Sequence, residues 1–248
     1  NITLEHDLDA KTQAHFTMSR GYKAGGASTP NFTGDTAITY DEETLYSLEA
    51  GIRSSFFEDK LDASLNVFYI YRNDPQFRDS QGAGSFFDYI TTNGHSAEHF
   101  GAEGEATWYI APNWNFNAAV GLLDAKRHSY TARGVDVESR KLANAPDFTF
   151  SARLDYNRDT GLFGNLELVG SKDYYESNSH SEKRNSFAIL NASVGYHYDN
   201  WTFTVWSKNL YDEEYEERVF FFDNGFGDQR YEAPAAPRTF GVTANYTW

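Results

Sequence analysis

The sequence predicts an all-β protein, a transmembrane antiparallel β-barrel. Three observations lead to this fold class: apolar and polar residues alternate along the chain, short connections alternate with long ones, and charges lie opposite the apolar face. Alternation with a period of two is typical of a strand whose two faces meet different surroundings. The last ten residues show it most simply, with Phe240, Val242, Ala244, Tyr246 and Trp248 on one face. That stretch alone fits a soluble β-sandwich as well as a barrel.

The alternation recurs in segments that we predict to be about 11 strands, and their connections differ in length in a regular way. The strands are expected at residues 2–8, 12–23, 45–57, 61–71, 86–109, 114–122, 148–156, 162–172, 186–198, 201–210 and 239–248. Tight turns such as 58–60 and 199–200 alternate with long polar stretches such as 127–145 and 211–238. All short turns then lie on one side and all long loops on the other, as in outer-membrane barrels.

The distribution of aromatic and charged residues decides between the sandwich and the barrel. Aromatic residues gather at the short-turn ends of the strands: Trp108, Trp114, Tyr156, Tyr198, Trp201, Tyr246 and Trp248. Such a belt is expected at a membrane interface. The inward faces carry Glu49, Arg53, Asp62, Arg72, Glu103, Glu105, Arg153, Asp155, Glu167 and Lys208. A sandwich core cannot hold so many charges, whereas a water-filled or plugged lumen can.

The odd strand number predicts that residues 1–248 form only part of a barrel. Bacterial single-chain barrels have an even number of strands, and an open sheet edge in lipid leaves backbone groups unpaired at a cost of several kcal/mol each. We therefore expect the C-terminal half of a barrel of about 22 strands, the size class whose lumen is plugged. The other strands and the plug would be absent from this chain.

Composition excludes several other classes. The net charge of -15 argues against a nucleic-acid partner, which needs clustered Lys and Arg. Aromatic residues make up 17% of the chain, no window of 18 residues is wholly apolar, and cysteine is absent. The sequence therefore predicts no transmembrane helix, no disulfide and no cysteine metal site.

The chain contains no convincing catalytic constellation, and we expect no enzyme. His95 and His99 fit the H-x-x-E-H pattern of some zinc peptidases, but that chemistry needs a helix. On the predicted strand the two residues stand roughly 13 Å apart and cannot share one zinc ion. Residues 223–228 loosely match a calcium loop but lack its downstream Glu. We expect neither a bound metal nor a covalent cofactor.

Several motifs resemble the C-terminal barrel of TonB-dependent receptors, most closely the ferric-siderophore branch. They are residues 19–26 (SRGYKAGG), 40–44 with 49–53, 66–71 with 74–77 (DPQF), 93–105, 205–215 (VWSKNLYDEEY) and 236–241 (APRTFG), in family order. The last strand also resembles the signal by which barrel proteins are recognised for assembly, with Gly241, Tyr246 and Trp248 at its places.

The resemblance implies a 22-stranded barrel in the bacterial outer membrane that imports a ferric siderophore. Its implied partners are the missing N-terminal barrel half and plug, the TonB complex acting through the plug, and outer-membrane lipid and lipopolysaccharide. The segment that contacts TonB has no counterpart here. Two alternatives stay open: import of another nutrient (haem, cobalamin or a glycan) by the same machine, and a passive porin.

Ligand contacts are expected in the long loops and the upper lumen wall, because function concentrates on loops held by a rigid scaffold. Ferric siderophores are often anionic with flat groups, which suits arginine beside aromatic rings. The candidates are Phe77, Arg78, Phe87, Tyr89, Arg127, His128, Arg133, Tyr174, Tyr175, Arg184, Tyr215, Arg218, Phe220 and Arg230, with Phe221 and Phe222 alongside. We expect residues 219–222 to form a loop core or a strand above the membrane.

Overall fold

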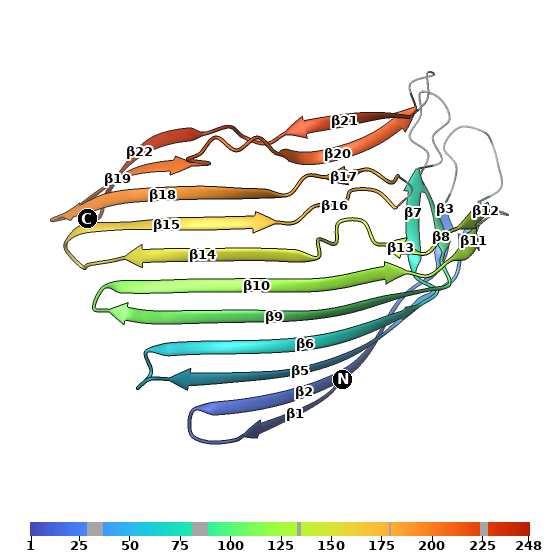
Figure 1. The fold of residues 1–248 in the computed structure, drawn as a ribbon, viewed down its shortest axis with the longest axis horizontal. Helices are drawn as coiled ribbons and strands as arrows, with labels where there is room; N and C mark the ends of the chain where they lie inside the picture. The colour runs from blue at the N-terminus through green and yellow to red at the C-terminus, as the bar shows by residue number, and fades with distance from the viewer. Residues whose placement is uncertain (29–36, 81–88, 133–134, 179, 224–227) are drawn as a thin grey trace.

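The computed structural model describes residues 1–28, 37–80, 89–132, 135–178, 180–223 and 228–248. In these ranges the chain forms one large antiparallel sheet whose strands follow each other in chain order, with the short β13 (Arg140–Lys141) pairing with β10 beside that path (Figure 1). The strands along this path are β1 Ile2–Asp7, β2 Thr12–Lys23, β5 Glu43–Phe56, β6 Leu61–Asn73, β9 Ser96–Ala111, β10 Trp114–Arg127, β14 Phe148–Tyr156, β15 Gly161–Ser171, β18 Phe187–Tyr198, β19 Trp201–Lys208 and β22 Thr239–Tyr246. The predicted fold class and number of sheet strands are confirmed.

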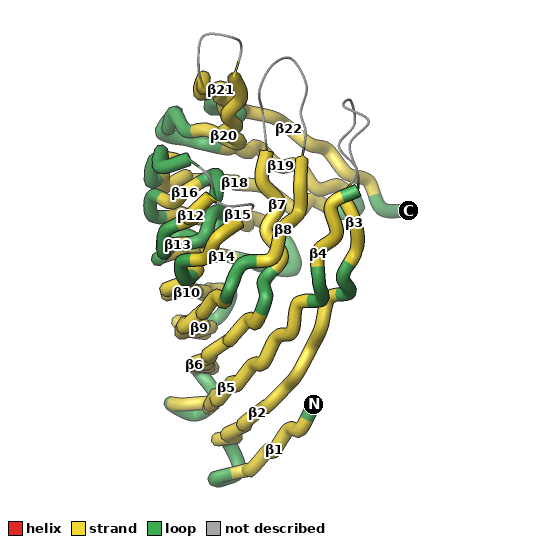
Figure 2. The backbone as a smooth tube through the Cα atoms, turned by 90° about the vertical axis from the view of Figure 1, so that its right-hand side faces the viewer, coloured by secondary structure: helices red, strands yellow, loops and turns green. Residues whose placement is uncertain are grey.

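The sheet is curved and open, with β1 and β22 at its opposite edges (Figure 2). No helix in the described ranges is long and apolar enough to cross a membrane. Short turns join the strands at one end, and residues such as Asp59, Asn113 and Asp199 take positive φ there. Asn and Asp tolerate this left-handed conformation, which explains their place in these turns.

The long connections at the other end fold into small hairpins. They are β3 Gly26–Ser28 with β4 Ile38–Tyr40, β7 Gln76–Ser80 with β8 Tyr89–Asn93, β11 Tyr130–Ala132 with β12 Val135–Val137, β16 Tyr174–Tyr175 with β17 Lys183–Arg184, and β20 Glu216–Asp223 with β21 Asp228–Pro234. The expectation of a strand at residues 219–222 is confirmed, because these residues belong to β20.

One predicted strand is wrong: residues 86–109 do not form a single element. The segment divides into β8, which belongs to a loop hairpin, and β9, which belongs to the sheet. The break lies at Gly94, whose N–H donates to the Pro75 carbonyl at 2.8 Å. A Cβ on Gly94 would lie 2.5 Å from the Phe77 ring, so the turn requires glycine there. Gly94 and Phe77 are distant in sequence, so the alternation of apolar and polar residues cannot predict that they lie so close together.

The two faces of the sheet differ as predicted. Outward apolar side chains are exposed, for example Leu65 at 51% and Val242 at 76%, because lipid is their natural surrounding. Inward charges pair along and across strands: Arg153 contacts Asp155 on its own strand at 2.8 Å, and Glu167, its register neighbour on β15, at 3.7 Å. Among the described residues the small buried hydrophobic cluster of Phe77, Ala97, Ala125 and Leu142 lies at the long-loop end. In the part of the chain that the structure describes, most large apolar side chains of the sheet are therefore exposed on its outward face rather than packed in a core.

The predicted aromatic belt forms in pairs at the short-turn ends. Trp114 lies against Tyr156 with ring centroids 4.7 Å apart, and Trp201 lies against Tyr246 at 5.0 Å. Gly241 of β22 has a packing role that its position in a terminal signal did not reveal. A Cβ there would lie 2.0 Å from Cζ2 of Trp206, so the glycine lets this inward indole lie flat across the last strand.

The free-energy cost of placing a charged side chain on the outward face should depend on how deep that position lies in the membrane. We predict that Leu65→Arg reduces the amount of assembled barrel, because an arginine in the middle of a lipid-facing band costs about 2–4 kcal/mol. Phe57→Arg is the matched control: Phe57 is also apolar and exposed, but it lies in a short turn. Heat-modifiable migration of the full-length protein from outer membranes measures assembly. Equal assembly of the two variants would contradict the assignment of this face to lipid.

Candidate ligand-binding site

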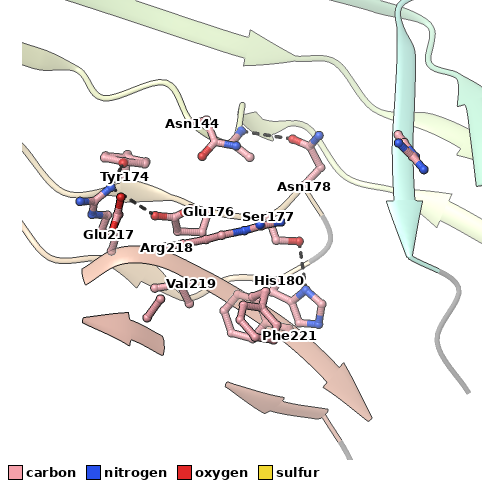
Figure 3. A pocket seen from close by; sticks show the side chains of 15 residues that line it. Asn144, Tyr174, Glu176, Ser177, Asn178, His180, Glu217, Arg218, Val219 and Phe221 are labelled. Atoms are coloured by element: carbon pink, nitrogen blue, oxygen red, sulfur yellow. Dashed lines mark hydrogen bonds and ion pairs between the residues drawn. The ribbon is translucent and has the colours of Figure 1, made fainter. Parts of the chain in front are cut away.

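A cavity of about 800 Å³ lies among the hairpins at the long-loop end. Its wall is built from β7, residues 143–144, β16 with the segment that follows it, β17, β20 and β21 (Figure 3). Three arginines from three different strands line it: Arg78, Arg184 and Arg218. Glu176 and Glu217 are the acidic residues of the described lining. Its size falls in the range of ligand pockets.

An aromatic wall is supplied by β20 and by the segment after β16. The rings of His180 and Phe221 lie nearly parallel, with centroids 4.3 Å apart and an interplanar angle of 12° (Figure 3). Phe220 also lines the cavity and stacks on Tyr231 of β21 at 5.6 Å. The β20–β21 hairpin therefore presents rings to the cavity and is itself held together by ring contacts.

The segment after β16 is held in place by Arg140. Its Nη2 donates to the carbonyls of Ser177 at 2.9 Å and His180 at 2.6 Å, and its guanidinium lies 4.3 Å from the Tyr175 ring centroid. A hydrogen bond of 3.0 Å joins Ser177 Oγ to His180 Nδ1. The backbone N–H of Ala143 donates to Asn178 at 3.1 Å. These contacts fix His180 before any ligand arrives.

A buried polar group closes one end of the cavity. Arg184 is 9% exposed, and its Nη1 donates to the Tyr174 hydroxyl at 2.5 Å. The same nitrogen is 3.7 Å from Glu176 Oε1, too far for a hydrogen bond, and this oxygen is buried without a hydrogen-bond partner. Burial raises the pKa of Glu176; Arg184 opposes this without outweighing it, and the charge of Glu216 adds to it.

Glu216, at the start of β20, is the better-paired acid. It accepts a hydrogen bond from Arg230 of β21 at 3.1 Å and a longer one of 3.4 Å from Asn185. Burial acts to raise its pKa, but the hydrogen bond from Arg230, a backbone hydrogen bond and the charges of Arg230 and Arg184 together outweigh burial, so the pKa of Glu216 lies below its ordinary value. Arg230 also pairs with Glu232 on its own strand. The Glu216–Arg230 ion pair ties the two strands of the hairpin together.

Comparison with known proteins gives this arrangement a family. The family model described as "TonB dependent receptor-like, beta-barrel" matches residues 1–210. This chain belongs to the TonB-dependent receptor family. The barrels of the family lie in the outer membrane of Gram-negative bacteria, and its members are transporters, not enzymes.

Solved receptors share the fold at low sequence identity. The ferric yersiniabactin uptake receptor FyuA from Yersinia pestis is 18% identical with a TM-score of 0.80, and the match covers 98% of this chain and 36% of that one. The siderophore receptor PiuA from Acinetobacter baumannii is 15% identical (TM-score 0.73; 98% and 34%). The copper transporter OprC is 17% identical (TM-score 0.73; 99% and 40%). The chain thus spans about a third of the length of these receptors.

The structure brings some of the predicted candidates together around the cavity and places others behind it. Those that line it are Arg78, Tyr174, Arg184, Arg218, Phe220 and Phe221. Those outside the lining are Phe77, Arg127, His128, Tyr175, Tyr215 and Arg230. Phe87 and Arg133 lie outside the described residues, and for Tyr89 and Phe222 only the strand placement is described. Contact with a ligand stays a prediction for every member of the set.

Phe77 and Arg127 have a packing role at the base of the loops. Phe77 is 4% exposed and stacks on Tyr130 at 5.8 Å, while Arg127, also 4% exposed, lies 6.0 Å from the Phe77 ring centroid. Nearby, Glu43 accepts two hydrogen bonds from Arg72, at 2.6 and 2.9 Å, and one from the backbone of Gln76 at 2.8 Å. This buried cluster anchors the first loops to the sheet.

The sequence did not single out Glu176, His180, Glu217 or Asn144, all of which line the cavity. They lie in polar stretches without periodicity, and contacts with Arg140, Ser177 and Phe221 hold His180 in place. The signal that was present is indirect: arginine and aromatic residues are concentrated in the same loops.

The Glu216–Arg230 pair should make the β20–β21 hairpin sensitive to acid. Because the folded pKa of Glu216 is lowered, its stabilising contribution is present above the ordinary carboxylate pKa and is lost as pH falls through the lowered value. Arg230→Met removes the hydrogen bond and the charge that lower this pKa, so burial should raise the pKa of Glu216 above its ordinary value. The protection of the hairpin from hydrogen exchange should then fall as pH rises. Hydrogen exchange of β20 and β21 in the full-length receptor, corrected for intrinsic rates, measures this.

Arg238→Met is the control for that experiment, because Arg238 pairs with Asp212 at 3.9 Å on the exposed surface and should leave the hairpin profile unchanged. Identical pH profiles for the wild type and Arg230→Met would show that this pair does not hold the hairpin.

Proposed function

We propose that this receptor imports an iron–siderophore complex across the outer membrane with energy from TonB. The observation that carries the proposal is the arginine-lined and ring-lined cavity among the long loops. The chain as a whole carries a net charge of -15, yet this lining holds more arginine than acid among its described residues. A local positive field within an acidic protein directs anionic ligands to that place.

The arginines of the lining differ in their exposure. Arg184 is engaged by Tyr174 and Glu176 within the wall. Arg78 and Arg218, both exposed, extend from β7 and β20 into the lining from separate hairpins. Guanidinium groups bind carboxylate and other planar anions through two parallel hydrogen bonds. The site is therefore suited to a bulky anionic chelate rather than to a neutral one.

The proposed transport involves no covalent chemistry. The loops capture the chelate on the outer side, and movement of a plug, driven by the TonB complex, releases it inward. The plug and further barrel strands are proposed partners that this chain does not contain. The unpaired edges of β1 and β22 support this, since each leaves backbone groups that lipid cannot satisfy. Phospholipid and lipopolysaccharide are the proposed surroundings of the outward face.

Other cargoes are less well supported. A neutral glycan would gain no charge-assisted hydrogen bond from the arginines of the lining. Membership of the TonB-dependent receptor family disfavours a passive porin. The likeness to the copper transporter OprC is at the level of the fold. Haem and cobalamin stay as alternatives that the same transport experiment separates.

A deletion strain tests the proposal directly. Uptake of radioactive iron from a panel of ferric siderophores should fall for at least one of them, and it should fall equally when TonB is inactivated. Unchanged uptake of every siderophore would contradict the proposal, and loss of haem or cobalamin uptake alone would support the alternative.

A cavity variant tests the site. Arg218→Ala should weaken binding of the transported chelate roughly tenfold or more, because hydrogen bonds to charged groups contribute about 1.5–3 kcal/mol. Lys172→Ala is the control, since Lys172 is an exposed cation of the same loop region that does not line the cavity. Equal effects of the two substitutions on the dissociation constant would remove the cavity from the proposal.

A further inference from the structure

The His180–Phe221 pair is a stacked ring pair in the cavity wall. The two rings come from different elements, the segment after β16 and strand β20, and meet face to face at 4.3 Å (Figure 3). Arg140 donates to the backbone carbonyl of His180, and a hydrogen bond joins Ser177 Oγ to the Nδ1 atom of the His180 ring. Because these contacts restrain the pair before a ligand binds, little conformational entropy is lost on binding. The pair is a preorganised flat surface.

A flat surface of this kind favours one class of ligand group. An aromatic ring laid against a stacked pair gains a further stacking contact, whereas a flexible aliphatic chain gains only the area it covers. Phe220 adds a further ring to the same wall. The wall therefore discriminates between chelates that carry aryl rings and those that do not.

The charged lining narrows the class further. Arg78 and Arg218 supply guanidinium groups that suit negatively charged oxygens and that also stack on rings. Glu217, on β20 next to Arg218, repels free carboxylates, and like charges brought together lower affinity. A chelate whose negative charge is spread over ring-bound oxygens meets the arginines without bringing extra carboxylates to Glu217.

From these features we infer that the receptor selects ferric chelates whose iron ligands are aryl oxygens, of the phenolate or catecholate type, over aliphatic hydroxamate and polycarboxylate chelates. This inference rests on the proposed function and adds the substrate class. In it Phe221 is the specificity-determining residue, with His180 as the second layer of the stack. Arg140 is a positioning residue that acts through His180.

Binding to the purified full-length receptor tests the inference. Three iron complexes serve as probes: a ferric tris-catecholate, a ferric trihydroxamate and ferric citrate. The catecholate should bind at least tenfold more tightly than either of the others. Phe221→Leu should raise its dissociation constant roughly three- to tenfold, the value of one lost stacking contact, and leave the hydroxamate unchanged. Phe221→Tyr, which keeps the ring, should restore binding.

Tyr130→Leu is the matched control, because it removes a ring of another stacked pair in the same loop layer that does not line the cavity. Heat-modifiable migration confirms that every variant is assembled. Equal affinity for all three probes, or an equal loss for all of them in Phe221→Leu, overturns the inference while leaving siderophore import intact. Failure of all iron complexes to bind or to be transported overturns the proposed function itself.

Discussion

The structure depends on one constraint: in lipid, every backbone N–H and C=O must be paired within the protein. Between its two edge strands, β1 and β22, the sheet meets it through continuous antiparallel ladders, joined by short turns at one end. The side chains are then free to follow the solvent, apolar outward and polar inward. This freedom explains how receptors only 15–18% identical to this chain share its fold with TM-scores of 0.73–0.80. The fold requires classes of residues rather than particular ones.

The loop layer obeys a different rule, because it lies above the lipid and must build its own interior. It does so with few apolar residues and many paired polar ones: Glu43 with Arg72, Glu216 with Arg230, and Arg184 with Tyr174. Buried pairs of this kind are costly to break from one side. The loops are therefore positioned by specific partners, and the cavity between them depends on those partners for its shape.

The sequence predicted the parts of the structure that follow a local rule, and not those that depend on distant partners. Strand positions, faces and the aromatic belt follow from alternation. The break at Gly94 does not, because it depends on the Phe77 ring packing against it. Arg127 and Phe77 have the composition of ligand contacts, but burial at 4% makes them supports of the loops. Glu176 and His180 gain their places from Arg184, Arg140 and Phe221, which no spacing reveals.

The division between sheet and loops has a consequence for specificity. A substitution on the outward face of the sheet must keep the residue apolar, since a charged side chain there is costly in lipid. A cavity residue such as Phe221 or Arg218 is not constrained in this way by the membrane, because it lies in a hairpin beyond the sheet. Under the proposed function, substitution there should alter ligand preference while the barrel stays assembled. On that proposal, the ring pair and the arginines of this cavity are the part of the chain that determines which ligand it transports.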